Sequence, residues 1–209
     1  MAPEVPAKQA RFAVPGGVLD HAFYARDALV VARALIGTVL VHVTRGAVRA
    51  VRIVETEAYR GPTDAACHAR VGLTKRTRTL LGPAGRAYVF LIYGMYDCFN
   101  VVCLKDGGGH AVLIRGGEPL VGIDPAQRAD GPGRLARALG ITRACNDLDL
   151  TTGERLYIAP RAKRPRIAVT ARVGVAYAGA VADEPWRFLD PSSVHVSRPA
   201  KKLIGRGLG

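Results

Sequence analysis

Two glutamates, spaced two residues apart, offer the most direct chemistry in this sequence. Glu55 and Glu57 lie in the run VRIVETEAYRGP, whose branched and apolar residues predict a β-strand that ends near the turn Gly61-Pro62. Side chains at positions i and i+2 of a strand point the same way, so we expect both carboxylates on one face. Such a pair can act as acid and base, can ligate a hard cation, or can be two ordinary surface glutamates. Because an acid at a strand end is presented to solvent, Glu57 is the candidate general base.

Aromatic side chains cluster in the sequence around this pair. They are Tyr59, His68, Tyr88, Tyr93 and Tyr96. Flat rings beside positive charge are typical of proteins that stack bases and hold phosphates. The chain has 30 Lys and Arg residues against 17 Asp and Glu residues, which gives a net charge of +13. The stretches 65–96 and 155–182 contain Lys or Arg residues but no Asp or Glu. This excess indicates a polyanionic partner, although a solvated basic surface has the same composition.

The turn Tyr93-Gly94-Met95-Tyr96 carries large side chains on a short connection. If exposed, they need a partner, and in a DNA-binding protein they can act as a wedge that unstacks a base step. The same residues can instead fold back onto the core. A lone histidine such as His68 is more often a hydrogen-bonded structural residue than a catalyst. Asn100 and Arg115 lie one predicted strand apart and could face one pocket, and neither is informative alone.

Composition limits the class of protein. With 209 residues the chain is long enough for one domain, which we place at 19–197, between a flexible segment at 1–18 and a basic tail at 198–209. No apolar run approaches the roughly 18 residues of a membrane helix, and no secretory signal is visible, so a cytoplasmic location is expected. The four cysteines lack zinc-ligand spacing, which predicts reduced, buried thiols and no metal site. They are Cys67, Cys98, Cys103 and Cys145.

Periodicity predicts the elements that must position the candidate residues. Helices are expected over 25–37 and 133–140, each ending at a glycine. The N-terminus of the second helix could offer free N–H groups to a phosphate, although helix-start punctuation explains the same residues. The predicted strands are 38–43, 48–54, 87–92, 98–104, 111–115, 166–170 and 186–189. The stretch 60–86 is expected to be irregular. Neighbouring strands with tight turns indicate the α+β class with a largely antiparallel sheet.

Five segments occur in a characteristic order. They are ETEAYRGPTDAACHAR, GRAYVFLIYGMYDCFNVV, VLIRGGEP, GPGRLARALGI and ARVGV. Together they resemble the alkyladenine (3-methyladenine) DNA glycosylase family, from about Tyr24 to Leu189, and ETEAY with YGMY is the most specific part. The resemblance implies a single α+β domain on a curved, mainly antiparallel sheet with flanking helices and a positively charged DNA face. It also implies a monomeric, monofunctional enzyme of base excision repair that flips alkylated purines out of double-stranded DNA.

The resemblance assigns the reaction to two residues. Glu57 corresponds to the carboxylate that activates water to hydrolyse the N-glycosidic bond, which leaves an abasic site. Arg115 corresponds to the basic residue near this water and the phosphate of the flipped nucleotide.

Tyr93 corresponds to the side chain that inserts into the vacated space, and Met95 lies on the same wedge. The expected partner is double-stranded DNA with damaged purines, and we expect no cofactor, membrane or obligate protein partner.

The resemblance assigns the base pocket to four further residues. Tyr59 and His68 correspond to residues that sandwich and contact the flipped base, and Asn100 to the residue that rejects the exocyclic amine of guanine. Phe90 stands where some relatives carry a third pocket tyrosine, so a stacking ring is kept and a hydroxyl is lost. The lesion range, from methylated purines alone to hypoxanthine or ethenoadenine, therefore stays open.

Two other function classes fit parts of the sequence. A non-catalytic basic protein that binds nucleic acid would have the same charge, aromatics and turns, and only Glu57 in its context argues against it. A glycoside hydrolase acting on sugars could use the carboxylate pair, but it predicts a neutral or acidic surface rather than a net charge of +13.

Overall fold

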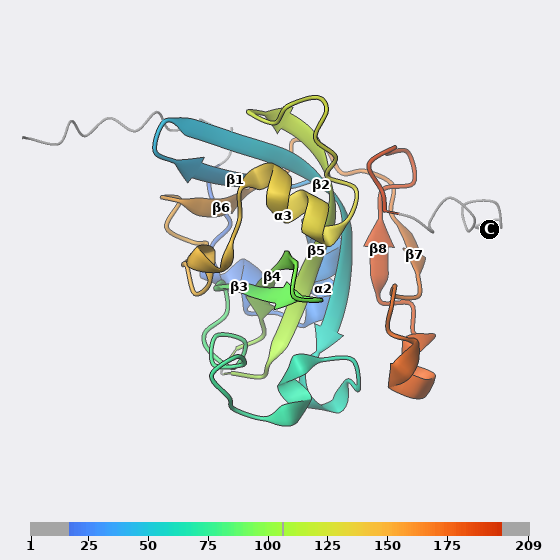
Figure 1. Cartoon of the computed structure of the whole chain (residues 1–209). Coiled ribbons are helices and arrows are strands. Elements are labelled where there is room, and N and C mark those ends of the chain that lie inside the picture. The colour runs from blue at the N-terminus through green and yellow to red at the C-terminus, as the bar shows by residue number, and fades with distance from the viewer. Residues whose placement is uncertain (1–16, 106, 198–209) are drawn as a thin grey trace, which may run out of the picture.

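One antiparallel sheet holds all eight strands found within residues 17–105 and 107–197, the part of the chain that the computed structural model describes (Figure 1). The order along the sheet is β3-β4-β5-β2-β1-β6, while β8 pairs with β2 and β7. The strands are β1 (Val39–Thr44), β2 (Ala47–Arg60), β3 (Ala87–Ile92), β4 (Tyr96–Cys103), β5 (His110–Val121), β6 (Leu156–Ala159), β7 (Ala168–Thr170) and β8 (Arg187–Leu189). The long β2 and β5 curve together through register shifts. The predicted α+β class with a curved, mainly antiparallel sheet is confirmed.

Short helices flank this sheet. The α-helices are α1 (His21–Tyr24), α2 (Ala28–Leu35) and α3 (Pro132–Leu139), and the 3-10 helices are η1 (Gly61–Thr63), η2 (His68–Val71), η3 (Arg143–Cys145) and η4 (Ala176–Ala182). The Asp27 carboxylate caps α2 by accepting the Leu29 N–H, and α3 ends at Gly140 in a left-handed conformation. Both predicted helices are present, the first starting at Ala28. Among the described residues, no helix has the length and apolar character to cross a membrane.

Two predicted strands are longer in the structure, and one strand was not predicted. Strand β2 runs past the predicted 48–54 to Arg60, beside the expected turn Gly61-Pro62, so Glu55 and Glu57 lie inside a strand that is bonded to β5 on one side and β8 on the other. Strand β5 extends beyond the predicted 111–115, and β6 was not predicted at all. These pairings join residues far apart in the chain, which a local pattern does not reveal. The calls on residues 1–16 of the N-terminal segment and on the tail 198–209 lie outside the described residues.

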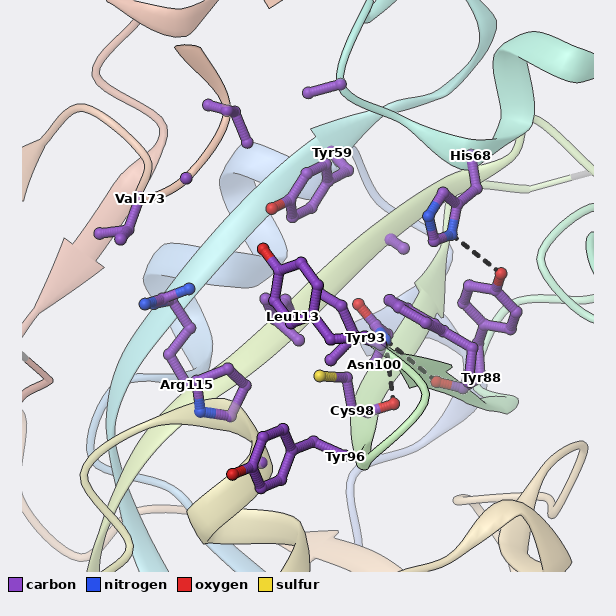
Figure 2. Close-up of a pocket in the computed structure, with 18 of the residues that line it drawn as sticks. Tyr59, His68, Tyr88, Tyr93, Tyr96, Cys98, Asn100, Leu113, Arg115 and Val173 are labelled. Atoms are coloured by element: carbon purple, nitrogen blue, oxygen red, sulfur yellow. Dashed lines mark hydrogen bonds between the residues drawn. The ribbon is translucent and has the colours of Figure 1, made fainter. Parts of the chain in front are cut away.

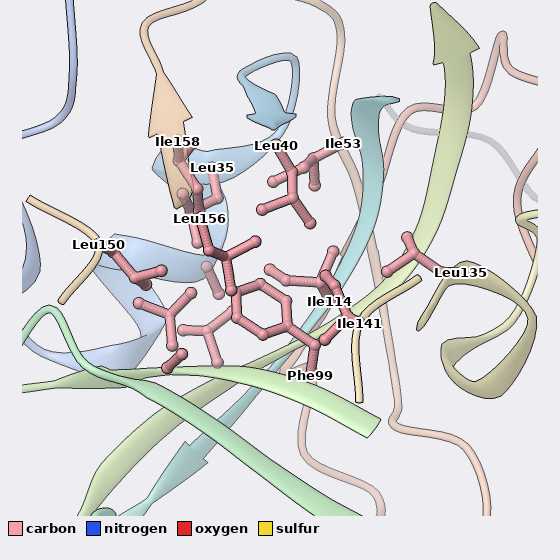
Figure 3. Close-up of a cluster of buried hydrophobic side chains, with 14 of the residues drawn as sticks. Leu35, Leu40, Ile53, Phe99, Ile114, Leu135, Ile141, Leu150, Leu156 and Ile158 are labelled. Atoms are coloured by element: carbon pink, nitrogen blue, oxygen red, sulfur yellow. The ribbon is translucent and has the colours of Figure 1, made fainter. Parts of the chain in front are cut away.

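Side-chain alternation gives the sheet two different faces. On β4, Phe99 and Val101 belong to the main hydrophobic core, whereas Cys98 and Asn100 point to the other face. The core includes residues of α2 and of β1, β5 and β6, and Figure 3 shows Phe99 among them. A rigid, close-packed layer therefore supports the polar face from behind. All four cysteines are free and buried, as predicted.

Replacing Phe99 by alanine should test this support. The ring is fully buried in the main core, so Phe99→Ala should lower the free energy of unfolding by about 3–5 kcal/mol in urea denaturation. Val30→Ala is the control, because Val30 is 48% exposed and should change stability little. Equal losses in the two variants would contradict the packing described.

Candidate active site

A cavity of about 790 Å³ opens on the face of the sheet that turns away from the main core. Its size falls within the roughly 300–1,000 Å³ of small-molecule sites. Alternate residues of neighbouring strands line it, and Figure 2 shows how their side chains converge. The sheet contributes Tyr59, Tyr88, Phe90, Ile92, Tyr96, Cys98, Asn100, Ala111, Leu113 and Arg115. The predicted site residues Tyr59, His68, Phe90, Tyr93, Asn100 and Arg115 are therefore brought together.

Strand register explains how the residues meet. Glu57 on β2 lies opposite Leu113 on β5, Leu113 lies opposite Asn100 on β4, and Asn100 lies opposite Tyr88 on β3. Directly opposed residues of an antiparallel sheet point to the same face, so this row crosses four strands on one side. The prediction that Asn100 and Arg115 face one pocket is confirmed by the cavity lining.

Glu57 is held beneath the cavity rather than exposed in it. Its side chain is fully buried and is not itself part of the lining. The Tyr59 hydroxyl donates to Oε2 at 3.0 Å, the Val173 N–H donates to Oε1 at 2.7 Å, and Arg115 Nη1 donates to Oε2 at 3.4 Å. These three donors belong to residues that line the cavity. The expectation of a strand-end carboxylate presented to solvent is wrong, because β8 and the segment around Val173 cover it.

Burial raises the pKa of Glu57, and this effect exceeds the opposing influence of Arg115, Val173 and Tyr59. Burial also holds the pKa of Tyr59 well above its ordinary value, so its hydroxyl stays protonated and available as a donor. A carboxylate that has a raised pKa and keeps a cationic neighbour is suited to accept a proton.

Arg172 anchors the segment that contacts Glu57. Its buried guanidinium donates to both carboxylate oxygens of Asp64, at 2.6 and 3.0 Å, and to the Ala58 carbonyl at 3.0 Å. It also lies over the Tyr59 ring, 4.7 Å from the centroid. Arg172 thus fixes Tyr59 from behind and places the Val173 N–H. Sequence reasoning missed this role, since a backbone donor has no residue-type signal.

Three rings form one wall of the cavity. The Phe90 centroid is 4.6 Å from that of His68 and 5.2 Å from that of Tyr88, and His68 Nδ1 lies 3.0 Å from the Tyr88 hydroxyl. The Asn100 amide donates to the carbonyls of Tyr88 and Cys98, which fixes its orientation (Figure 2). The wall therefore presents flat, fixed surfaces to a planar guest.

Arg76 sets the protonation of His68. Arg76 Nη2 lies 3.4 Å from His68 Nε2, and a guanidinium only donates, so Nε2 accepts and the neutral ring carries its proton on Nδ1. Burial, followed by the positive charge of Arg76, lowers the pKa of His68 to about 4. Its ring is therefore neutral at physiological pH and is no general acid.

The turn after β3 points outward, as its wedge interpretation predicted. Tyr93 is 80% exposed and Met95 69%, and Tyr93 lines the cavity mouth whereas Met95 does not. Tyr93 has a φ of +52°, a left-handed conformation that costs on the order of 1–2 kcal/mol for a bulky residue. Across the mouth, Tyr177 is 74% exposed and also lines the cavity. Sequence reasoning did not single out Tyr177.

The positive charge is distributed unevenly around the site. Arg76, Arg134 and Arg137 line the cavity, the last two from α3. The residues Gly131, Pro132 and Gly133 at the N-terminus of α3 line it as well. By contrast, Arg172 is buried as a structural residue, so only part of the two basic stretches faces the cavity. Within the described residues, no group of three or more His, Cys, Asp or Glu side chains is placed to hold a metal ion.

The profile of the methylpurine-DNA glycosylase family matches residues 22–194 of the 209-residue chain. The chain belongs to this family. The resemblance seen in the sequence is thereby confirmed, and with it the class of enzyme. In a methylpurine-DNA glycosylase the substrate is DNA, which agrees with the arginine-lined cavity mouth.

Curated relatives cover most of the chain, and each bears the name "Putative 3-methyladenine DNA glycosylase". The protein from Myxococcus xanthus is 54% identical over 86% of this chain and 93% of its own length. That from Anaeromyxobacter dehalogenans is 53% identical over 87% of each chain. The relative from Methanocella arvoryzae is 47% identical over 88% of this chain and 97% of its own length.

The protonation of His68 can be measured directly. NMR titration of its ring should show a neutral imidazole at every pH above about 4, against an ordinary value of 6.5. Arg76→Ala should raise this pKa, because it removes a positive charge that opposes the imidazolium. Arg137→Ala is the control, since Arg137 also lines the cavity but makes no contact that perturbs His68. An ordinary titration in the parent protein would contradict the described contact.

Proposed function

We propose that this glycosylase removes 3-methyladenine-type purines from double-stranded DNA by hydrolysing the N-glycosidic bond with a water that Glu57 activates. The observation that carries the proposal is the buried Glu57 carboxylate, held by three residues that also line the ring-walled cavity. Family membership and the names of the relatives support the substrate class. The product is an abasic site, as in the first step of base excision repair.

Base flipping is part of this proposal because a base inside the duplex cannot reach a buried carboxylate. Extrusion costs a few kcal/mol, less for a damaged or mispaired base. Tyr93 is exposed at the cavity mouth, where it can enter the stack and fill the vacated space. Arg134 and the N-terminus of α3 lie at the same mouth, where they can hold the backbone phosphate.

The chemistry needs few groups because an N-alkylated purine is cationic. Such a base stacks on electron-rich rings, here Tyr59 and Phe90, and it leaves as a neutral molecule. The water oxygen bonds to C1′, the C1′–N bond breaks with its electron pair going to the purine, and the water proton passes to Glu57. Asn100 lies in the cavity with its amide fixed by two backbone carbonyls, where it can exclude the exocyclic amine of guanine.

Glu57 keeps one acceptor site for the water. An ionised carboxylate accepts about four hydrogen bonds, and Tyr59, Val173 and Arg115 supply three donors. The remaining acceptor site can hold a water that enters between these residues from the cavity. Arg115 keeps the carboxylate charged in its buried position and can orient the same water.

Glu57→Gln should abolish most excision while leaving DNA binding intact. The amide is isosteric but accepts no proton, so the single-turnover rate of base release should fall by about 10²- to 10⁴-fold. The parent rate should fall as pH drops, starting above the ordinary glutamate range, because the carboxylate form is required and its pKa is raised. Glu154→Gln, at an exposed position, is the matched control. A Glu57→Gln protein with parental excision would disprove the general-base role.

Tyr93→Ala should separate a wedge from a purely structural turn. Base–aromatic stacking contributes about 1–3 kcal/mol, so excision from duplex DNA should fall on the order of 10- to 100-fold. Excision from a single-stranded oligonucleotide should change less, since no pair has to be opened. Leu120→Ala is the control, because Leu120 is 48% exposed outside the cavity. Unchanged excision from duplex DNA by Tyr93→Ala would show that Tyr93 has no part in base flipping. If the parent protein binds DNA without excising a base, the non-catalytic alternative is favoured.

A further inference from the structure

Glu55 is enclosed by four hydrogen-bond donors. Its fully buried carboxylate accepts Arg115 Nε at 2.9 Å, Arg187 Nε at 2.8 Å and the Ser197 hydroxyl at 2.8 Å on Oε1, and the Ser197 N–H at 2.6 Å on Oε2. Both oxygens are therefore held in place, and the side chain has no exposed edge. Glu55 is suited to fix its neighbours rather than to act as an open second member of an acid–base pair.

Ser197 connects both arginines to this anion. Its hydroxyl accepts from Arg115 Nη2 at 3.2 Å, and its carbonyl accepts from Arg187 Nη2 at 3.2 Å. The residue before it, Val196, packs against Val54 of β2. Ser197 is 3% exposed, so all these contacts are shielded from water. The end of the described chain thus reaches the back of the active site.

The fold makes room for this approach at Gly116, the residue after Arg115 on β5. A Cβ at Gly116 would lie 2.8 Å from the His195 carbonyl oxygen and 3.1 Å from the Glu55 Cβ. Only glycine fits there without displacing the C-terminal segment. The close contact at Gly116 and the hydrogen bonds of Ser197 are separate observations, and both bring residues 195–197 next to Arg115.

We propose that Ser197, together with Glu55 and Arg187, is a positioning residue that holds the Arg115 guanidinium in register with the carboxylate of Glu57. The proposal deepens the function proposed above and rests on it. Arg115 is held by Glu55 on Nε and by Ser197 on Nη2, which aims Nη1 at Glu57. The two contacts of Arg115 with Glu57 are both 3.4 Å, longer than those with Glu55 and Ser197. They are the first to be lost when the guanidinium rotates.

Arg115 and Glu55 have opposite effects on the pKa of Glu57. Its charged and titratable neighbours are Glu55 and Tyr59 on β2, Arg115 on β5, Arg187 on β8 and Arg172 before Val173. Arg115 lowers the pKa of Glu57, and the like charge of Glu55 raises it. Loss of the Ser197 hydroxyl loosens Arg115, so the pKa of Glu57 should rise. Neutralising Glu55 removes the like charge and leaves Glu57 as the charged partner of Arg115, so the pKa of Glu57 should fall.

The test is the pH dependence of the release of 3-methyladenine from methylated duplex DNA under single-turnover conditions. Ser197→Ala keeps the backbone contacts and loses one hydrogen bond. It should release the base about 2- to 10-fold more slowly near neutral pH, a factor that corresponds to one hydrogen bond. The acidic limb of its pH–rate profile should move to higher pH. Glu55→Gln should move the limb to lower pH. Ser197→Thr retains a hydroxyl and should restore the parental profile. Affinity for abasic-analogue DNA should stay parental in all three.

Ser193→Ala is the matched control, because the Ser193 hydroxyl contacts only the His195 N–H on the same segment. It should leave the profile unchanged. A parent protein without excision would overturn the proposed function itself. If the parent is active and Ser197→Ala has the parental pH–rate profile, the positioning role alone is overturned. The same holds if Ser197→Thr fails to restore the parental profile. If Glu55→Gln does not fold, the pair Ser197→Ala and Ser197→Thr decides.

Discussion

Four buried charges impose the main constraint on this structure. Glu55, Glu57, Arg115 and Arg187 are each at most 7% exposed, and an isolated buried ion costs several kcal/mol. Two carboxylates and two guanidiniums balance only if each sits within hydrogen-bonding distance of its partners. Strands β2, β5 and β8 must therefore meet at one place, and two of the register shifts between β2 and β5 flank Glu55.

The same requirement explains why segments far apart in the chain close around Glu57. The Val173 N–H comes from beyond β7, and Arg172 secures it by a bidentate pair with Asp64 near η1. A second buried pair thus supports the first, because the aromatic ring of Tyr59 lies between Arg172 and the cavity. Fixed polar contacts of this kind position a reacting group without reorganisation at the moment of reaction.

The sequence predicts the strands and helices around the site well and the depth of the site poorly. The predicted strand 98–104 and helices 25–37 and 133–140 correspond to β4, α2 and α3, and a glycine follows each helix. Nothing local shows that Glu57 is covered, because β8 and Val173 lie more than a hundred residues away. Residue type and spacing made Glu57 a candidate general base but left the pair open among an acid–base pair, a cation site and two surface glutamates. The roles of the other site residues came from the family resemblance.

A water-activating base and a side chain that enters a base stack need opposite environments. A base that activates water, the role proposed for Glu57, must be held within fractions of an ångström, and Glu57 lies in mid-strand, bonded on both sides. A side chain that enters a base stack, the role proposed for Tyr93, must instead project from the surface, and Tyr93 projects from a turn with a left-handed φ of +52°. The strain of that turn is tolerated because β3 and β4 pair on both sides of it. The antiparallel hairpin of β3 and β4 thus joins a rigid wall of the cavity to an exposed tip, whereas Glu57 is held separately in β2. The two demands are met by different strands of one sheet.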